Sequence, residues 1–201
     1  MRNNYVIGSL HWDNSKGYGF DDTPPMTYSG EYFEKYQVMD NTEMGIALTD
    51  IRVAFVNEFY IGQSIIDIGI GGGRFCKQRG AYGYDVSNEA VEWLKSVGMY
   101  ADPYASQVDA LTFWDSLEHI PDPAAIVQQS KKWVFVSMPI YKDMDDCLIS
   151  KHYKPGEHLH YWTDQGLIDW FAGQGFVCMD CHDAETQAGR EGILSYAFKR
   201  I

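Results

Sequence analysis

The segment Asp67-Ile-Gly-Ile-Gly-Gly-Gly73 constrains the fold of this chain more than any other, because it places four glycines directly after a short β-branched run. The run over residues 64–68 predicts a strand, and the residues after the glycines predict a short helix. Glycines at such a turn let the backbone adopt positive φ angles and approach a ligand closely. Open α/β sheets bind ligands at turns of this kind. We therefore expect a ligand-binding loop, the alternative being a turn that serves tight packing alone.

Short apolar runs alternate with helical stretches from residue 64 onward. This alternation is typical of a parallel sheet with helices on both faces. The expected strands cover residues 64–68, 81–85, 98–102, 109–114, 133–138, 176–182 and 193–200. The last two are joined by a connection too short for a right-handed crossover, so we expect them to pair antiparallel. The predicted fold class is therefore α/β, with a mostly parallel sheet.

Capping residues mark the starts of three helices within this pattern. Ser87 precedes the helical stretch NEAVEWLKSV, proline begins PDPAAIVQQS, and Thr163 precedes DQGLIDWFAGQ. Hydroxyl side chains accept hydrogen bonds from the first free backbone N–H groups of a helix, and proline suits its first turn. These positions predict where three of the covering helices begin.

The N-terminal part of the chain has a different character. Residues 1–40 mix glycine, proline, aspartate and tyrosine without a steady period, which predicts loops and a short helix. Over residues 43–59, apolar residues at spacings of four, three and four predict an amphipathic helix. These residues are Met44, Leu48, Ile51 and Phe55. We expect an N-terminal lid segment and helix over residues 1–59 and a cofactor-binding domain over residues 60–201.

Charge and hydropathy exclude several classes of partner. The chain carries 28 acidic and 16 basic residues, and a net charge of -12 repels phosphate backbones. Tight non-specific nucleic-acid binding is therefore not expected. No apolar run approaches the roughly 20 residues of a membrane span, and the first residues lack the apolar core of a secretory signal. We expect a cytoplasmic protein without a membrane partner, and the oligomeric state is left open.

Two common nucleotide motifs do not fit the glycine loop. A dinucleotide fingerprint needs glycines at relative positions one, three and six. The sixth position is Arg74 when counted from Gly69, and Cys76 when counted from Gly71. A phosphate-binding P-loop needs a lysine followed by serine or threonine after the glycines, and none is present. The remaining pattern is D-x-G-x-G-x-G.

Over residues 60–201 the chain resembles the class I methyltransferases that use S-adenosylmethionine (SAM). The resemblance rests on D-x-G-x-G-x-G, on GYDVS at residues 83–87, on DALTFWDSLEHIPDP at residues 109–123 and on EHLHYWT at residues 157–163. It implies a Rossmann-like sheet of seven strands whose last strand is antiparallel. It also implies SAM as the cofactor.

The resemblance assigns the cofactor contacts residue by residue. The residues that hold the methionine part of SAM are then Asp67, Gly69, Gly71 and Gly73. Asp85 would hold both ribose hydroxyls, a task that suits a carboxylate because its two oxygens accept two donors at once. Asp102 is the candidate residue near the adenine, and Val86 and Trp114 complete the predicted contacts. The tyrosines at positions 28, 32 and 36 are either a lid over SAM or one buried helical face.

The residues after the fourth expected strand carry the candidate catalytic groups. Asp115, Glu118 and His119 share one face if a helical turn follows that strand, and such a set binds divalent metals. A similar arrangement ligates a metal in the resembling ubiquinone O-methyltransferases and ribose methyltransferases, the latter with a distant histidine. His158 or His160 is the candidate here. The predicted metal ligands are Asp115, Glu118, His119 and His160, and the predicted catalytic residues are Glu118, His119 and His158.

Without a metal, Glu118 and His119 would hold the loop after the strand, and His119 or His158 would act as general base. In either case we expect methyl transfer from SAM to a hydroxyl or other nucleophile of a small molecule. The alternatives are an acceptor on a protein or a nucleic-acid end, and a SAM-binding sensor or subunit without turnover.

Overall fold

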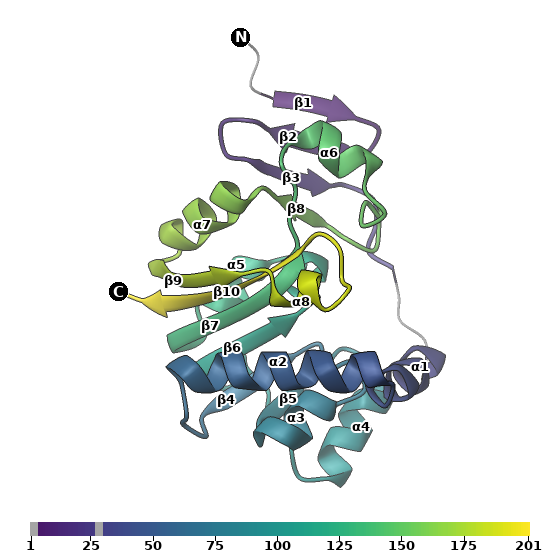
Figure 1. Ribbon diagram of the computed structural model, residues 1–201, viewed down its shortest axis with the longest axis vertical. Helices are drawn as coiled ribbons and strands as arrows, with labels where there is room; N and C mark the ends of the chain where they lie inside the picture. Colours follow the sequence, from purple (N-terminus) through teal and green to yellow (C-terminus); the bar gives the residue numbers. More distant parts are fainter. Residues whose placement is uncertain (1–3, 27–29) are drawn as a thin grey trace.

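The computed structural model describes residues 4–26 and 30–201, which form two sheets with surrounding helices (Figure 1). The larger sheet has the strand order β5-β4-β6-β7-β10-β9. Its strands are β4 (Ile65–Ile68), β5 (Tyr82–Tyr84), β6 (Val108–Trp114), β7 (Ser130–Pro139), β9 (Phe176–His182) and β10 (Ile193–Arg200). Strand β10 runs antiparallel to both of its neighbours, and the β5-β4-β6-β7 pairings are parallel. The predicted mostly parallel sheet with an antiparallel last strand is confirmed.

The strand expected over residues 98–102 is reduced to a single bridge. Tyr100 pairs in parallel with Gly83 at the β5 edge of the sheet. Six strands and this bridge therefore stand where seven strands were expected.

Both faces of the larger sheet are covered, because successive strand residues point to opposite sides. Ile65 packs with Phe55 of α2 (Glu43–Phe59) and Phe75 of α3 (Arg74–Arg79). Ile66 belongs to the core on the other face, which contains Phe171 of α7 (Asp164–Gly173) together with side chains of α5 (Pro123–Val127). The remaining helical elements are α1 (Gly30–Asp40), α4 (Asn88–Ser96), η1 (Leu117–His119), α6 (Met144–Ile149) and α8 (Ala184–Gln187).

The predicted helix starts are found in the structure. Ser87 accepts from the N–H of Ala90 at the start of α4, and Thr163 accepts from the N–H of Gly166 at the start of α7. Helix α5 begins two residues after the expected Pro121, at Pro123, and Asp122 is its N-cap; a proline again occupies the first turn. The amphipathic helix over residues 43–59 is α2, whose N-cap is Thr42. These local signals were sufficient because capping depends only on neighbouring residues.

The N-terminal part contains a sheet where loops and a short helix were expected, and the prediction for this part was incomplete. Strands β1 (Asn4–Ile7), β2 (Leu10–Asp13) and β3 (Tyr18–Asp21) form an antiparallel meander. Its fourth strand is β8 (His160–Trp162), which pairs antiparallel with β3. Helix α1 follows the meander. The EHLHYWT segment therefore belongs to a sheet that is built mainly from the N-terminal residues.

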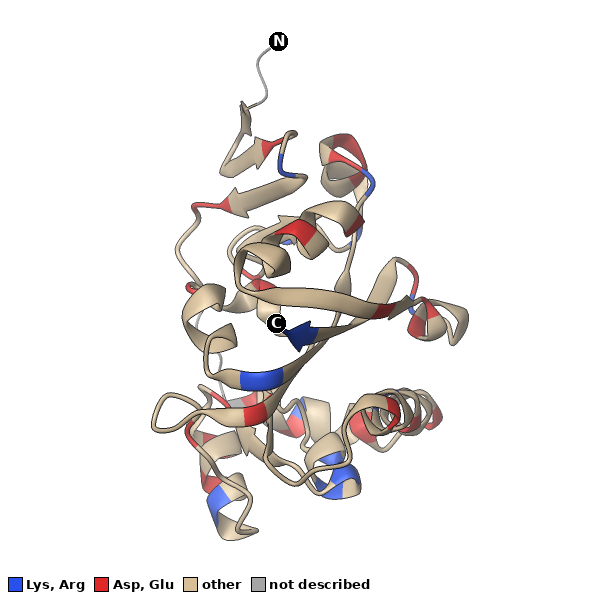
Figure 2. Cartoon of the chain, turned by 90° about the vertical axis from the view of Figure 1, so that its left-hand side faces the viewer, with Lys and Arg blue, Asp and Glu red and all other residues tan. Residues whose placement is uncertain are grey.

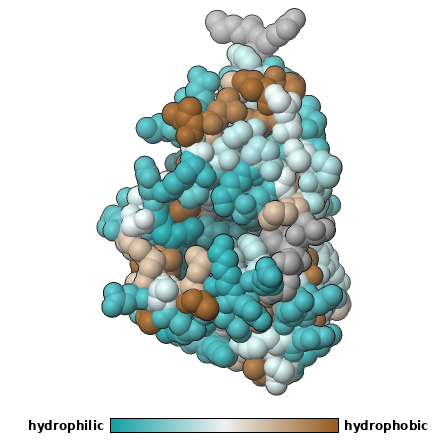
Figure 3. Space-filling view, turned by 90° about the vertical axis from the view of Figure 1, so that its right-hand side faces the viewer, coloured by the Kyte–Doolittle hydropathy of each residue, from teal (hydrophilic) through white to brown (hydrophobic). Residues whose placement is uncertain are grey.

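The parallel strands end on one side of the molecule, to the right in Figure 1. Viewed from that side, the surface has a central recess bordered by hydrophilic residues, with an apolar patch on the N-terminal sheet above it (Figure 3). Within residues 4–26 and 30–201, no helix is long and apolar enough to cross a membrane.

Acidic residues are distributed over most elements on the opposite side of the molecule, and basic residues are scattered between them (Figure 2). The lysine pair at positions 131 and 132 is partly neutralised. Their Nζ atoms lie 3.7 Å and 2.8 Å from the carboxylate of Asp109. This pair therefore does not offer a free basic patch.

Candidate functional site

The glycine loop follows β4 and takes a shape that only glycine allows at two of its positions. Gly69 has a φ of 73° and Gly73 a φ of 83°. A Cβ atom at Gly69 would lie 2.7 Å from the Cβ of Ser116, and one at Gly73 would overlap the ring of Trp93. At Gly71, with a φ of 55°, the nearest atom is Cδ1 of Tyr36 at 3.5 Å. The loop therefore packs closely against the rest of the protein at Gly69 and Gly73, whereas no atom of the described residues crowds the backbone at Gly71.

Asp85 stands beside this loop, as the sequence predicted. It follows β5, and its two carboxylate oxygens accept from the backbone N–H groups of Ile70 (3.0 Å) and Ser87 (2.9 Å). Burial raises the pKa of Asp85, and the backbone donors oppose this shift. Each carboxylate oxygen has a further lone pair for a ligand hydroxyl. Val86 beside it is exposed.

Asp67 lies beneath the loop rather than on its surface. Its side chain is 1% exposed and accepts from the Thr112 hydroxyl at 2.6 Å. The Sγ of Cys76, in the helix after the loop, lies 3.8 Å from its other oxygen. Burial raises the pKa of Asp67 to about 7. In this structure Asp67 therefore joins β4 to β6 and α3 under the glycines.

The other two predicted cofactor residues lie at different depths. Trp114, at the end of β6, is buried, and its ring packs edge-on against Phe75 with 5.2 Å between centroids. Asp102 is exposed and accepts from the N–H of Tyr104 at 2.8 Å. The structure brings Gly69, Gly71 and Asp85 together, places Trp114 in the adjoining core, and leaves Asp102 at the sheet edge.

Helix α1 lies against the glycine loop and carries two of the predicted lid tyrosines. The hydroxyl of Tyr32 donates to that of Tyr36 at 3.0 Å, and Tyr36 approaches Gly71. Asp40 at the end of the helix accepts from the N–H of Arg74 at 3.1 Å. The third lid tyrosine, Tyr28, lies outside the described residues. The sequence analysis did not single out Asp40, because no local pattern links it to Arg74, 34 positions further along the chain.

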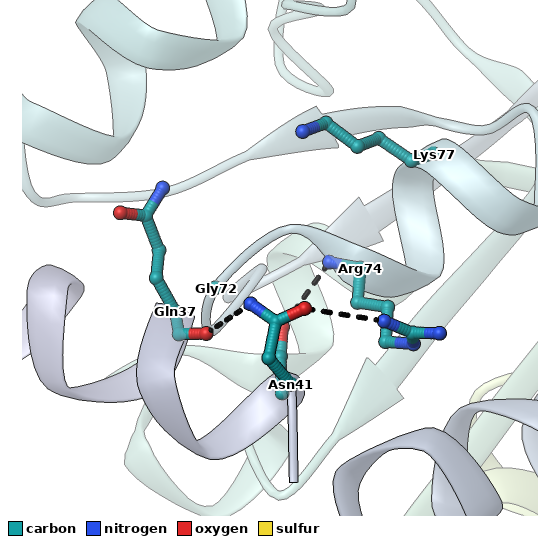
Figure 4. Close-up of a pocket in the computed structure, with 6 residues that line it drawn as sticks. Gln37, Asn41, Gly72, Arg74 and Lys77 are labelled. Carbon is teal, nitrogen blue, oxygen red and sulfur yellow. Dashed lines mark hydrogen bonds between the residues drawn. The ribbon is translucent and has the colours of Figure 1, made fainter.

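A cavity of about 300 Å³ lies between α1 and α3 beside the loop (Figure 4). Its lining consists of Gln37, Asp40, Asn41, Gly72, Arg74 and Lys77. Asp85 is not part of this lining, so the cavity lies next to the predicted cofactor crevice and does not coincide with it. The side chain of Asn41 donates to the carbonyl of Gln37 and accepts from Arg74, which closes one side of the cavity.

Glu118, His119 and His158 converge next to the end of β6. One potential ligand atom from each side chain lies within 4.8 Å of the others. The rings of His119 and His158 meet edge-on with 4.7 Å between centroids, and Nε2 of His119 is 3.9 Å from Oε1 of Glu118. The backbone N–H of Leu159 donates to the carbonyl of Glu118 at 2.8 Å, which holds the EHLHYWT segment against η1.

The electrostatics of this cluster favour neutral side chains. Burial, followed by the charge of Asp115, raises the pKa of Glu118 well above its ordinary value. Burial also lowers the pKa of His119, and it lowers that of His158 to about 3. Both oxygens of Glu118 are buried and have no hydrogen-bond partner among the described residues. A cation among the three side chains would satisfy these oxygens and meet two neutral imidazoles, the form in which histidine binds metals.

Asp115 and His160 have other partners, so the predicted metal set is not brought together as a whole. Asp115 accepts two hydrogen bonds from Arg190 (2.7 and 2.8 Å) and one from Arg52 (3.0 Å). Burial raises the pKa of Asp115, but Arg190 and then Arg52 outweigh it and hold this pKa below its ordinary value. Nδ1 of His160 accepts from the hydroxyl of Tyr18 at 2.7 Å, and Nε2 donates to the carbonyl of Ile120 at 2.9 Å.

The observed cluster differs from the predicted metal set because of the shape of the turn after β6. The spacing argument assumed a helical turn beginning at Asp115. Instead Asp115 has a φ of 54°, and η1 begins at Leu117. Its side chain therefore leaves the face that Glu118 and His119 share. Among the described residues, His158 takes the third position in the cluster.

Comparison with known proteins identifies the family. A family model described as a methyltransferase domain matches residues 39–180, which is most of the chain. The chain belongs to this family. The class I, SAM-dependent methyltransferase fold that the sequence motifs predicted is thereby confirmed.

One curated relative of this methyltransferase domain is a ubiquinone biosynthesis O-methyltransferase of Pectobacterium atrosepticum, with 26% identity over 110 residues. The match covers 43% of this chain and 46% of the relative, so the chain spans less than half of its length.

Solved structures share the fold at low sequence identity. Magnesium protoporphyrin IX methyltransferase from Synechocystis PCC 6803, with bound S-adenosylhomocysteine (SAH), has 14% identity and a TM-score of 0.55; the match covers 88% of this chain and 90% of that one. 1,6-Didemethyltoxoflavin-N1-methyltransferase from Burkholderia thailandensis, also with SAH, has 13% identity, a TM-score of 0.57 and 99% coverage of both chains. These likenesses concern the fold alone.

Proposed function

We propose that this methyltransferase domain binds SAM at the carboxyl ends of β4 and β5 and transfers its methyl group to a hydroxyl oxygen of a small molecule. The observation that carries the proposal is the contact between Asp85 and the glycine loop. This contact brings a carboxylate that can accept from both ribose hydroxyls of SAM next to glycine backbone that the methionine part of SAM can approach closely. The small-molecule acceptor is supported by the acidic surface and by the small-molecule acceptors named for the relatives.

The reaction is an in-line displacement. The acceptor oxygen forms a bond to the methyl carbon while the carbon–sulfur bond breaks, SAH leaves, and the hydroxyl proton passes to a base. Where no metal is bound, His119 is the candidate base, because burial keeps its imidazole neutral and it lies after the end of β6. The domain contributes mainly by positioning the two reactants. Within the N-terminal residues 1–59, helix α1 against the glycine loop is proposed to act as the lid, while α2 belongs to the core.

The residues Glu118, His119 and His158 fit a divalent cation. A carboxylate with two imidazoles suits first-row metals. The buried Glu118 oxygens, which lack a hydrogen-bond partner among residues 4–26 and 30–201, mark the place. When bound, the cation would lower the pKa of the acceptor hydroxyl. This set replaces the predicted one that included Asp115 and His160.

The cation can be tested by calorimetry with Mn²⁺ and by the effect of chelators on methyl transfer. Glu118→Gln is expected to weaken Mn²⁺ binding by about tenfold, because an amide lacks the carboxylate charge. Chelation is expected to lower the transfer rate by a similar factor. If an established activity survives chelation unchanged, the metal is absent from the mechanism and the metal-free arrangement with His119 as base remains.

Asp85→Asn is expected to weaken SAH binding by about tenfold, because hydrogen bonds to a charged acceptor are stronger than those to an amide. Isothermal titration with SAH measures this directly. The matched control is Asp109→Asn at the amino end of β6, where the carboxylate pairs with Lys132 far from the crevice. Equal affinities for wild type and Asp85→Asn would remove the ribose assignment.

The acceptor class is tested by incubating the protein with SAM carrying a labelled methyl group and a pooled cell extract. Label recovered in a small molecule supports the proposal. Label recovered only in protein or RNA supports the polymer acceptor instead. SAH binding without any turnover supports a sensor or subunit.

A further inference from the structure

Four charged side chains, two from helices and two from loops, meet at the carboxyl ends of β6 and β7. We call Arg52, Asp115, Glu185 and Arg190 the four-charge cluster. Arg52 of α2 donates to Glu185 of α8 at 2.7 Å and to Asp115 at 3.0 Å. Arg190 donates to both Glu185 and Asp115 at 2.7 Å. Two positive and two negative charges thus close a ring of ion pairs around the end of β6.

The cluster holds the chain in an unusual backbone conformation. Asp115 is the sole non-glycine residue with a positive φ among residues 4–26 and 30–201. Residues with a Cβ adopt this region rarely, and aspartate and asparagine tolerate it best. The N–H of Asp115 donates to the carbonyl of Ser137 at 2.7 Å, and the Ser137 hydroxyl donates to Glu185. Contacts of both the side chain and the backbone of Asp115 therefore hold the turn in place.

This turn is in direct contact with the glycine loop. The hydroxyl of Ser116, the next residue, donates to the carbonyl of Ile68, the last residue of β4. Ser116 is also the residue that excludes a side chain at Gly69. A shift of the turn would therefore move the first glycine of the predicted SAM loop.

A purely structural turn has no need of four partly buried charges. Replacing a buried ion-pair set by apolar side chains is often neutral or stabilising, because desolvation offsets much of the attraction. What ion pairs with two-pronged arginine contacts supply is a defined geometry. Glu185 is 0% exposed and accepts hydrogen bonds from both Arg52 and Arg190. If the two arginines rotated away from Asp115, the buried carboxylate of Glu185 would lose these partners.

We infer that Asp115 and Arg190 are positioning residues for SAM binding: their ion pair fixes the turn against which Gly69 rests, and so sets the shape of the glycine loop. The inference rests on the proposed function. It gives Asp115 a role different from the metal ligand that its spacing to Glu118 suggested.

The test is isothermal titration with SAH, together with the thermal midpoint of each variant. Asp115→Asn keeps the size of the side chain and tolerates the positive φ, so it removes the charge and little else. We expect it to weaken SAH binding by about tenfold, the range seen when supporting contacts of a binding group are lost. Arg190→Lys, which keeps the charge but not the two-pronged contact, is expected to give a smaller loss in the same direction. The double variant Asp115→Asn/Arg190→Lys should lose less than the sum, because both changes break one pair.

The matched control is again Asp109→Asn, an aspartate at the other end of β6 with a lysine partner, and its SAH affinity should equal that of wild type. A lower thermal midpoint with unchanged SAH affinity in both Asp115→Asn and Arg190→Lys would overturn the inference, because the cluster would then be structural only. If Asp115→Asn does not fold, Arg190→Lys decides. Absence of SAH binding by the wild type would overturn the proposed function and this inference together.

Discussion

Gly69→Ala is expected to lower the methyl-transfer rate by about 100-fold, the effect of moving a positioning group by about 1 Å. Alanine at a φ of 73° is strained by about 1–2 kcal/mol. The added methyl would also lie 2.7 Å from the Cβ of Ser116, and neither group can yield without shifting its backbone. The loop must therefore move away from the position that Asp85 and β4 define.

Gly98→Ala provides the control, because Gly98 has the same φ of 73° and no atom within 4 Å of an added Cβ. Its variant should lose about 1–2 kcal/mol of stability and keep the transfer rate of wild type. Transfer rates and free energies of unfolding for the three proteins check both statements. Equal rates for Gly69→Ala and wild type would show that the loop is not the cofactor cradle.

The contribution of Asp67 to the free energy of unfolding should fall as pH rises from 5 to 8. Burial raises its pKa in the folded protein to about 7, above the value of 3.8 expected for the unfolded chain. Between these values the folded state binds a proton that the unfolded state has released, so raising the pH stabilises the unfolded state. The loss continues until Asp67 ionises in the folded protein, near pH 7.

Asp67→Asn should remove this contribution, which amounts to about 3 kcal/mol between pH 5 and pH 8. Urea unfolding at the two pH values measures it. Asp109→Asn should leave the change as it is in wild type, because the pKa of Asp109 is lowered by Lys132 and its carboxylate stays ionised throughout this range. A pH dependence that is the same in wild type and in Asp67→Asn would mean that Asp67 is already ionised in the folded state at pH 5.

Much of the domain fold was predictable because its signals are local. The β-branched run before the glycines, the caps at Ser87 and Thr163, and the short link between β9 and β10 each depend on a few neighbouring residues. The pairing of Asp85 with the glycine loop was predictable as well, because parallel neighbouring strands end at the same edge of a sheet.

The N-terminal sheet was missed because its fourth strand is distant in sequence. Leu10 and Trp12 alternate with polar residues, and the Gly8-Ser9 turn joins β1 to β2, which is a hairpin signal. Four-residue strands are weak on their own, however, and β3 is completed by β8 from residues 160–162. Recognition of the Gly-Ser turn would have revealed the hairpin but not its partner.

The cluster of Glu118, His119 and His158 was predicted only in part, for a similar reason. Glu118 and His119 are adjacent, so their proximity follows from the sequence. His158 rather than His160 joins this cluster because His160 lies in β8 and accepts a hydrogen bond from the hydroxyl of Tyr18 in β3. The role of Asp115 depends on Arg52 and Arg190, 63 and 75 residues away in sequence. No spacing rule reports contacts of that kind.

A crystal structure of the complex with SAH tests the central claim most directly. It should show both ribose hydroxyls within hydrogen-bonding distance of the Asp85 carboxylate and the homocysteine end against the backbone of Gly69 and Gly71. SAH bound elsewhere, for example in the cavity between α1 and α3, with Asp85 free of the ribose, would contradict the account.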